Sequence, residues 1–160
     1  MGLDAVFYCD CFEKGTIRKA PPQPELVYVD ANGQVCLKWD APGADQNAFY
    51  DWLHSACEHA PAGELISHRL GNAARIGLLR ALLLYFASEF HILLTKVIYD
   101  GTHAGDRLDV SEIGRLNHEI NNLQAVHSRD RGEEDIIRQF EQQMSELVAA
   151  AQRLQKPIVF

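Results

Sequence analysis

The clearest local signal in this sequence is the stretch LVYVDANGQVCLKW, residues 26–39. Asn32-Gly33 in its middle separates two runs of β-forming residues and predicts a hairpin turn, since both residues tolerate a positive φ. The second run alternates apolar with polar or small residues, which predicts one buried face. The positions expected on that buried face are Val35, Leu37 and Trp39.

Upstream of the hairpin, residues 5–12 form a short run that is rich in β-forming residues and predicts another strand. Side chains alternate across a strand, so Cys9 and Cys11 are expected on one face of it. The prolines of residues 20–24, APPQP, predict an extended loop after this strand, because proline blocks helix formation.

From Asp45 onward, apolar residues recur every three or four positions, which is the period of an amphipathic helix. Asp45 is the expected cap of this helix, and the segment with Pro61 and Gly63 is expected to end it. A second, more apolar helix is predicted from a cap at Asn72 to about Phe86.

The intervening residues 65–70 fit either a short strand or a loop, and residues 90–99 favour helix in their first half. Asp109 and Glu112 have the spacing of a capping box and predict the start of a further helix. Residues 158–160 are expected to form a terminal strand or an anchored tail. A long final helix is predicted from an apolar stripe made of Ile137, Phe140, Met144, Leu147, Ala151 and Leu154.

Strands therefore come first and helices follow. This order predicts an α+β fold, with a small antiparallel sheet from the N-terminal third packed against a helical C-terminal part. The length of 160 residues fits one compact domain, residues 1–160. No glycine fingerprint for a dinucleotide and no phosphate-binding loop occurs, which disfavours a nucleotide-binding doubly wound fold.

Fifteen Lys and Arg against 22 Asp and Glu give a formal net charge of -7. This balance argues against nucleic-acid binding, which needs a clustered positive field, and suits a basic partner. The longest apolar run, residues 78–86, is too short for a membrane span. The N-terminus has no secretory pattern, so we expect a bacterial-type cytoplasm in which the four cysteines are reduced thiols.

Cysteine and histidine gather in two short segments, FYCDCF at residues 7–12 and HSACEH at residues 54–59. Thiolate and imidazole are zinc ligands, and a tetrahedral site needs four that converge. The set that could hold zinc is Cys9, Cys11, Cys57 and His59, with His54 as a further candidate. Packing is the favoured alternative, because free cysteine is often buried and Cys-x-Cys is not the usual zinc spacing. We therefore expect no resident cofactor, with zinc as the alternative.

Two further polar clusters could carry chemistry or contact a partner. His68 and Arg69 precede the helix that starts at Asn72 and could hold an anion there, or could simply form a polar elbow. The loop DGTHAGD, residues 100–106, places a histidine between aspartates, as in a tuned acid or base, or forms an ordinary glycine-bearing turn. The candidate partner-binding residues are Tyr8, Asp10, Glu13, His68, Arg69, Thr102, His103 and Asp106. No catalytic residues are assigned.

The segments YCDCFE, CEH, HRLGN and GTHAGD together resemble a family of small, uncharacterised bacterial proteins. The resemblance reaches to about Asp106, and the helical C-terminal third carries little of it. It implies a bacterial cytoplasmic setting and no catalytic roles, and it suggests that the polar clusters belong to one site or one surface.

Two functional hypotheses remain open. The favoured one is a non-enzymatic binding protein, specifically an immunity-type inhibitor of a bacterial toxin, since an acidic inhibitor gains electrostatic steering toward a basic toxin domain. The alternative is a zinc-binding module or a metal-dependent enzyme that uses the Cys/His cluster. Self-association through the stripe of the final helix, giving a homo-oligomer, is a further possibility.

Overall fold

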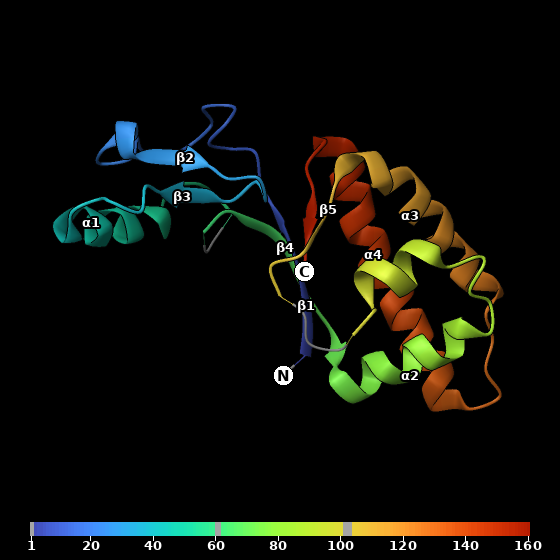
Figure 1. Cartoon of the computed structure of the whole chain (residues 1–160). Helices are drawn as coiled ribbons and strands as arrows, with labels where there is room; N and C mark the ends of the chain where they lie inside the picture. The colour runs from blue at the N-terminus through green and yellow to red at the C-terminus, as the bar shows by residue number, and fades with distance from the viewer. Residues whose placement is uncertain (1, 60–61, 101–103) are drawn as a thin grey trace. The chain divides into compact units, whose positions relative to one another are not determined.

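The computed structural model describes residues 2–59, 62–100 and 104–160 (Figure 1). The chain divides into two compact units, which we call the larger and the smaller unit. The larger unit comprises Met1–Val6 and Ser67–Phe160, and the smaller unit comprises Phe7–Ile66. A single domain over residues 1–160 stays a prediction.

A four-stranded sheet has the order β4-β1-β6-β5. Its strands are β1 (Gly2–Tyr8), β4 (Glu64–Asn72), β5 (Arg107–Leu108) and β6 (Ile158–Val159). The β6 strand runs antiparallel to both neighbours, with Val159 opposite Val6 of β1 and Arg107 of β5. The C-terminal residues thus form the terminal strand that was one of the two expected alternatives. The α+β fold class is confirmed, and β4, β5 and β6 join the N-terminal strand in the sheet.

Three α-helices belong to the larger unit, namely α2 (Ala73–Leu84), α3 (Val110–Asn122) and α4 (Arg131–Leu154). Figure 1 shows α3 and α4 running side by side, and α4 also contacts α2. The predicted stripe of α4 is buried from Ile137 to Ala151, so its apolar face packs within the chain itself. Short helical turns at Leu93–Val97 (η2) and Leu123–Ala125 (η3) complete the unit. Oligomerisation through α4 stays a prediction.

The predicted hairpin is confirmed in the smaller unit. Strands β2 (Val27–Val29) and β3 (Val35–Leu37) pair antiparallel after a helical turn, η1 (Pro24–Leu26). Gly33 takes φ +80°, which only glycine adopts at little cost, and the Asp30 carboxylate accepts hydrogen bonds from the Asn32 and Gln34 N–H groups. Trp39 lies beyond β3 and is 93% exposed, so the expectation that it shares the buried face is wrong.

Helix α1 (Gly43–Leu53) packs Phe49 and Trp52 against the hairpin. Its N-cap is Pro42, so the prediction of Asp45 as the cap is wrong. Asp45 lies in the first turn, where a carboxylate is favourable, and its side chain accepts a hydrogen bond from Gln23.

The capping predictions in the larger unit have mixed outcomes. Asn72 caps α2, since its side chain accepts from the Arg75 N–H at 2.9 Å. Asp109 is the N-cap of α3 but makes no side-chain cap bond. Glu112 does not reach back to it, because Lys96 Nζ donates to Glu112 Oε1 at 2.7 Å. The capping box predicted there is therefore wrong in its side-chain bonds.

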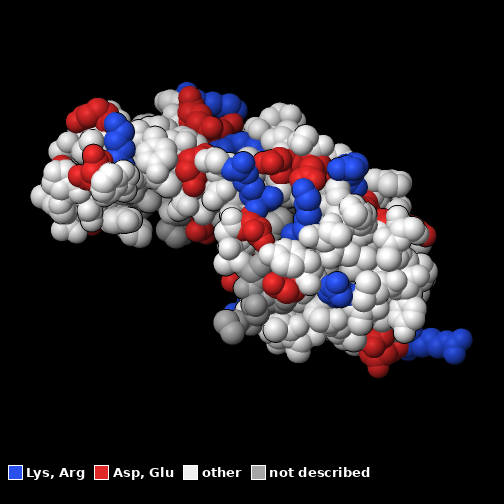
Figure 2. Space-filling model, viewed as in Figure 1, with Lys and Arg blue, Asp and Glu red and all other residues white. Residues whose placement is uncertain are grey.

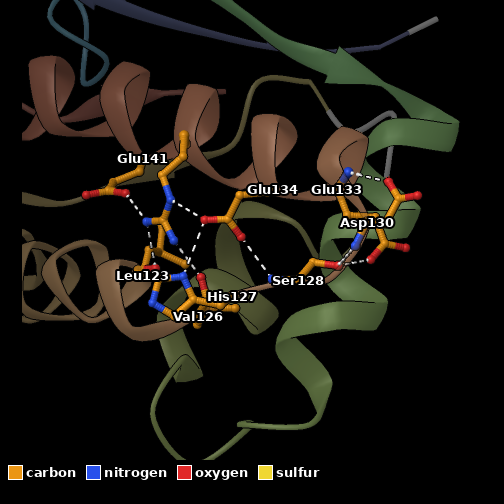
Figure 3. Close-up of polar contacts among 9 residues, drawn as sticks. Leu123, Val126, His127, Ser128, Asp130, Glu133, Glu134 and Glu141 are labelled. Carbon is orange, nitrogen blue, oxygen red and sulfur yellow. Dashed lines mark hydrogen bonds and ion pairs between the residues drawn. The ribbon is translucent and has the colours of Figure 1, made fainter.

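A polar network ties the end of α3 to α4 (Figure 3). Arg138 of α4 donates to the backbone carbonyl oxygens of Leu123 and Val126, and its guanidinium also pairs with Glu134 and Glu141. Glu134 accepts a further hydrogen bond from the Ser128 N–H at 2.8 Å. The bond to Val126 satisfies the carbonyl at the C-cap of η3, whereas the Leu123 carbonyl also accepts from the Val126 N–H within η3.

This network predicts an acid-sensitive contribution to stability. The hydrogen bond from the Ser128 N–H, with the Arg138 guanidinium beside it, lowers the pKa of Glu134 from 4.5 to about 2. Because the folded pKa is lower than the unfolded pKa, the contribution is present above pH 4.5 and is lost as the pH falls toward 2. We expect Glu134→Gln to flatten the decline of the urea midpoint between pH 5 and pH 2.

The matched control is Asp135→Asn, which removes the same charge from the neighbouring, exposed position. It should leave the decline as steep as in the unchanged protein. Equal slopes for Glu134→Gln and the unchanged protein would contradict the assignment.

Candidate metal centre

Cys9 and Cys11 lie just beyond the first strand. β1 ends at Tyr8, so the prediction of a strand through residue 12, with both thiols on one strand face, is wrong. The chain instead turns back on itself, as the Thr16 N–H donates to the Cys11 carbonyl at 2.8 Å and Gly15 takes φ +68°. The sulfur atoms are positioned by this turn and not by strand alternation.

Cys57 and His59 follow α1, whose last residue is Leu53. Backbone hydrogen bonds hold this segment against the first turn. The Arg18 N–H donates to the Ala56 carbonyl at 2.7 Å, and the Cys9 N–H donates to the Gly63 carbonyl at 2.8 Å. Two segments about 50 residues apart in sequence are thus fixed side by side within the smaller unit.

The four side chains converge on one point. One potential ligand atom from each of Cys9, Cys11, Cys57 and His59 lies within 4.8 Å of all the others. The Cys9 and Cys57 sulfur atoms are 3.9 Å apart, and the Cys11 sulfur is 3.3 Å from His59 Nδ1. All four cysteines of the chain are free thiols, and the three in this cluster are buried. We call these four residues the metal cluster.

These distances fit tetrahedral zinc. Bonds of about 2.3 Å to sulfur and about 2.1 Å to nitrogen place neighbouring ligand atoms about 3.5–3.8 Å apart. The 3.9 Å between the Cys9 and Cys57 sulfurs and the 3.3 Å between the Cys11 sulfur and His59 Nδ1 lie on either side of that interval, so small movements would close the shell around an ion. The other ring nitrogen of His59, Nε2, lies 3.9 Å from the Glu58 carboxylate. A histidine that binds a metal through one ring nitrogen commonly has a carboxylate near the other.

The preferred protonation state of the metal cluster depends on whether a cation is bound. Burial raises the pKa of the Cys9 thiol to about 12, and the neighbouring Cys57 and Cys11 sulfurs act in the same direction. Without a cation the Cys9 thiol stays protonated and contributes only packing. A divalent cation reverses this preference, because a thiol that coordinates it loses its proton.

The space beside the metal cluster is small. A cavity of about 20 Å³ borders the three thiols and is otherwise lined by apolar side chains such as Ile17, Trp52 and Leu53. That volume has room for about one water molecule, and its apolar walls offer such a water few partners. With four protein donors and no room for a substrate, the arrangement matches a structural zinc site more closely than a catalytic one.

Gly63 was not identified from the sequence as part of the site. It takes φ +77°, and a Cβ at this position would lie 3.3 Å from the Cys9 sulfur. The sequence signal was the glycine in PAGE, residues 61–64, which predicted only the end of a helix. The same glycine both turns the chain and leaves space for the thiol.

Gly63→Ala is therefore expected to weaken zinc binding by about tenfold or more, because it adds a contact on Cys9 to the strain of a positive φ. Gly15→Ala is the matched control, since Gly15 has φ +68° and open space around its would-be Cβ. Competition with a chromophoric chelator measures both affinities. Equal losses in the two variants would show that backbone strain, and not crowding of the thiol, limits binding.

The remaining sequence candidates of the smaller unit lie outside the metal cluster. His54 is exposed at the C-cap of α1. Burial raises the pKa of the Tyr8 phenol, and the charges of Glu64 and Asp30 add to the shift. Asp10 pairs with Lys14 one turn on, and Glu13 is exposed.

The candidates of the larger unit have local partners. His68 Nε2 lies 2.8 Å from the Glu146 carboxylate, and the Arg69 carbonyl accepts from Gln143 at 3.2 Å. Asp106 accepts a hydrogen bond from the Tyr99 hydroxyl, which raises the pKa of Tyr99 to about 12. Thr102 and His103 lie outside the described residues. The elbow with its Asn72 cap is present, and a single surface that unites the polar clusters stays a prediction.

Comparisons with protein-family models, with curated proteins and with solved structures find no match to this chain. The resemblance to small bacterial proteins therefore stays a prediction. Among residues 2–59, 62–100 and 104–160, no helix combines the length and the apolar character needed to cross a membrane.

Proposed function

We propose that this chain is a zinc-stabilised binding protein in which Cys9, Cys11, Cys57 and His59 hold one structural Zn²⁺. The observation that carries the proposal is the convergence of four zinc-type ligand atoms within 4.8 Å. Bound there, the ion joins the turn after β1 to the segment after α1. It does so in a unit of 60 residues, a size at which a hydrophobic core alone gives little stability.

A metal-dependent enzyme is the weaker use of the same residues. Catalytic zinc keeps one coordination position for water or substrate, whereas this cluster supplies four protein donors. Three of those donors are buried beside a cavity of about 20 Å³. Both features support a role in holding the fold.

Elemental analysis of protein purified without a histidine tag tests the zinc proposal. About one zinc per chain is expected, and chelation should release it together with part of the folded structure. Protein that contains no zinc after expression in zinc-supplemented medium, and that binds none when titrated with Zn²⁺, would overturn the proposal.

For the biological role we propose an immunity-type inhibitor of a basic bacterial toxin domain, acting in the cytoplasm. The distribution of charge supports this role. The smaller unit carries four Lys and Arg against nine Asp and Glu, a net charge of -5 over 60 residues. Such a density of negative charge speeds encounter with a positively charged partner.

Co-expression with the product of a neighbouring toxin gene tests this role. The inhibitor should restore growth and should co-purify with the toxin, more strongly at low salt than at high salt. Unrelieved toxicity with no retained complex would reject the immunity role and would leave the zinc proposal standing, because the metal content is measured separately.

A further inference from the structure

An aromatic groove lies in the smaller unit between the β2–β3 hairpin and α1. Its rim includes Tyr28, which is 45% exposed, and Tyr50, which is 59% exposed. Phe49 forms part of its floor and is buried. The complete lining is Tyr28, Gln34, Val35, Cys36, Leu37, Phe49, Tyr50 and Leu53.

The fold holds the ring of Tyr50 and the backbone of Tyr28. The Tyr50 ring packs edge-on against Phe49, with ring centroids 5.4 Å apart and an angle of 69° between the planes. Phe49 in turn belongs to the core cluster with Trp52. Tyr28 is fixed by hairpin register, since it pairs with Cys36. Exposed aromatic rings on rigid elements lose little conformational entropy when a partner binds them.

The smaller unit, which contains the groove, is acidic. Burial raises the pKa of the Cys36 thiol, which lines the groove, and the charge of Asp30, which follows β2, adds to the shift. Asp51 is exposed directly after Tyr50. Lys38, directly after β3, is one of four basic residues in a unit with nine acidic ones. Figure 2 shows red acidic side chains with a blue basic side chain beside them where α1 lies.

We propose that this groove binds a basic segment of a partner protein, with an arginine side chain stacked on Tyr28 or Tyr50. A guanidinium group gains from the face of an aromatic ring and from nearby carboxylates at the same time, which an acidic or neutral segment does not. Apolar contacts with Leu37 and Leu53 would accept the methylene part of such a side chain. This inference rests on the proposed binding function and not on the identity of the toxin.

The direct test titrates zinc-loaded, full-length protein with hexa-arginine, hexa-lysine and hexa-glutamate peptides and follows binding by calorimetry and by amide chemical shifts. Hexa-arginine should bind most tightly, hexa-lysine more weakly and hexa-glutamate not measurably. The shifts should map to the hairpin and α1. Equal binding of the acidic peptide, or shifts confined to other elements, would overturn the groove.

Variants separate the aromatic contribution from packing and from net charge. Tyr50→Leu keeps an apolar side chain but removes the ring, and it should weaken hexa-arginine binding by about fivefold. Tyr28→Leu should act similarly. Tyr85→Leu is the control, because Tyr85 is an 85% exposed tyrosine of the larger unit. Circular dichroism and zinc content verify that each variant is folded. Unchanged affinity in both groove variants, or an equal loss in Tyr85→Leu, would reject the proposal.

The outcomes of these experiments test the groove proposal and the immunity proposal separately. Binding of hexa-arginine that depends on Tyr50, in a chain that does not suppress a toxin, would keep the groove and reject the immunity role. Suppression of a toxin that is unaffected by Tyr50→Leu and Tyr28→Leu would keep the immunity role and reject the groove.

Discussion

Cys57→Ser is expected to reduce the zinc content from about one ion per chain to near zero and to unfold the smaller unit at room temperature or slightly above. Serine cannot provide a thiolate, and a site with three ligands binds zinc far more weakly than one with four. Structural zinc contributes about 10–16 kcal/mol of apparent binding free energy in zinc-finger peptides. Losing about a third of that, about 3–5 kcal/mol, would cancel what a core of this size provides.

Cys36→Ser is the matched control for this variant. Cys36 is the fourth free cysteine, lies half-buried in β3, and is not part of the metal cluster. The Cys36→Ser variant should retain about one zinc per chain and a nearly unchanged thermal midpoint. Adding a chelator to the unchanged protein should reproduce the behaviour of Cys57→Ser, because both remove the same ion.

Thermal unfolding followed by circular dichroism, together with elemental analysis of each variant, measures these outcomes. A Cys57→Ser protein that keeps its zinc would reject the assignment of this ligand. If Cys57→Ser and Cys36→Ser lose the same small amount of stability with no zinc in either, the cysteines act in packing alone.

The elements that were predicted correctly are those whose signal is local. The stripe of α4 repeats with the period of the helix itself, so Ile137 and Phe140 could be assigned to the core without knowing what covers them. The hairpin is similar, because Gly33 supplies the positive φ that the turn requires and the register then follows from the chain.

The predictions that failed depend on residues far away in sequence. Glu112 has correct spacing to reach Asp109, but Lys96, sixteen residues earlier, binds its carboxylate instead. The ion pair with the exposed Lys96 takes the place of a capping bond, and the spacing pattern contains no information about it. The prediction that Trp39 is buried failed because the strand that would bury it ends at Leu37.

For the metal cluster, one part could be predicted from local sequence and another part could not. The candidate ligands could be named from the sequence, because thiolate and imidazole are zinc ligands, but the sequence favoured packing over a metal for the same residues. Their convergence could not, since it depends on the Gly63 loop and on backbone bonds between Cys9 and Gly63. Cys9 and Cys11 do lie close together, but they do so in the turn after β1 and not on one face of a strand.

The second large effect on stability is expected at Glu119, in the larger unit. It lies on α3 and is only 7% exposed, which is unusual for a glutamate. Its two carboxylate oxygens accept hydrogen bonds from the Ile92 N–H at 2.8 Å and the Leu93 N–H at 2.9 Å. Those N–H groups begin the helical segment that includes η2, where the first turn has no intrahelical acceptors. Glu119 therefore caps one helix from the side of another.

Glu119→Ala is expected to destabilise the protein by about 2–4 kcal/mol, because it leaves two N–H groups on buried residues without an acceptor. Glu119→Gln should destabilise the protein less than Glu119→Ala does, since an amide oxygen can accept one of the two bonds. His118→Ala changes the adjacent, exposed position of α3 and should cost less than about 0.5 kcal/mol. Urea unfolding measures the free energies, and hydrogen exchange identifies the cause. The amides of Ile92 and Leu93 should exchange much faster in Glu119→Ala than in His118→Ala, whereas retained protection at both amides would show that the carboxylate is not the cap.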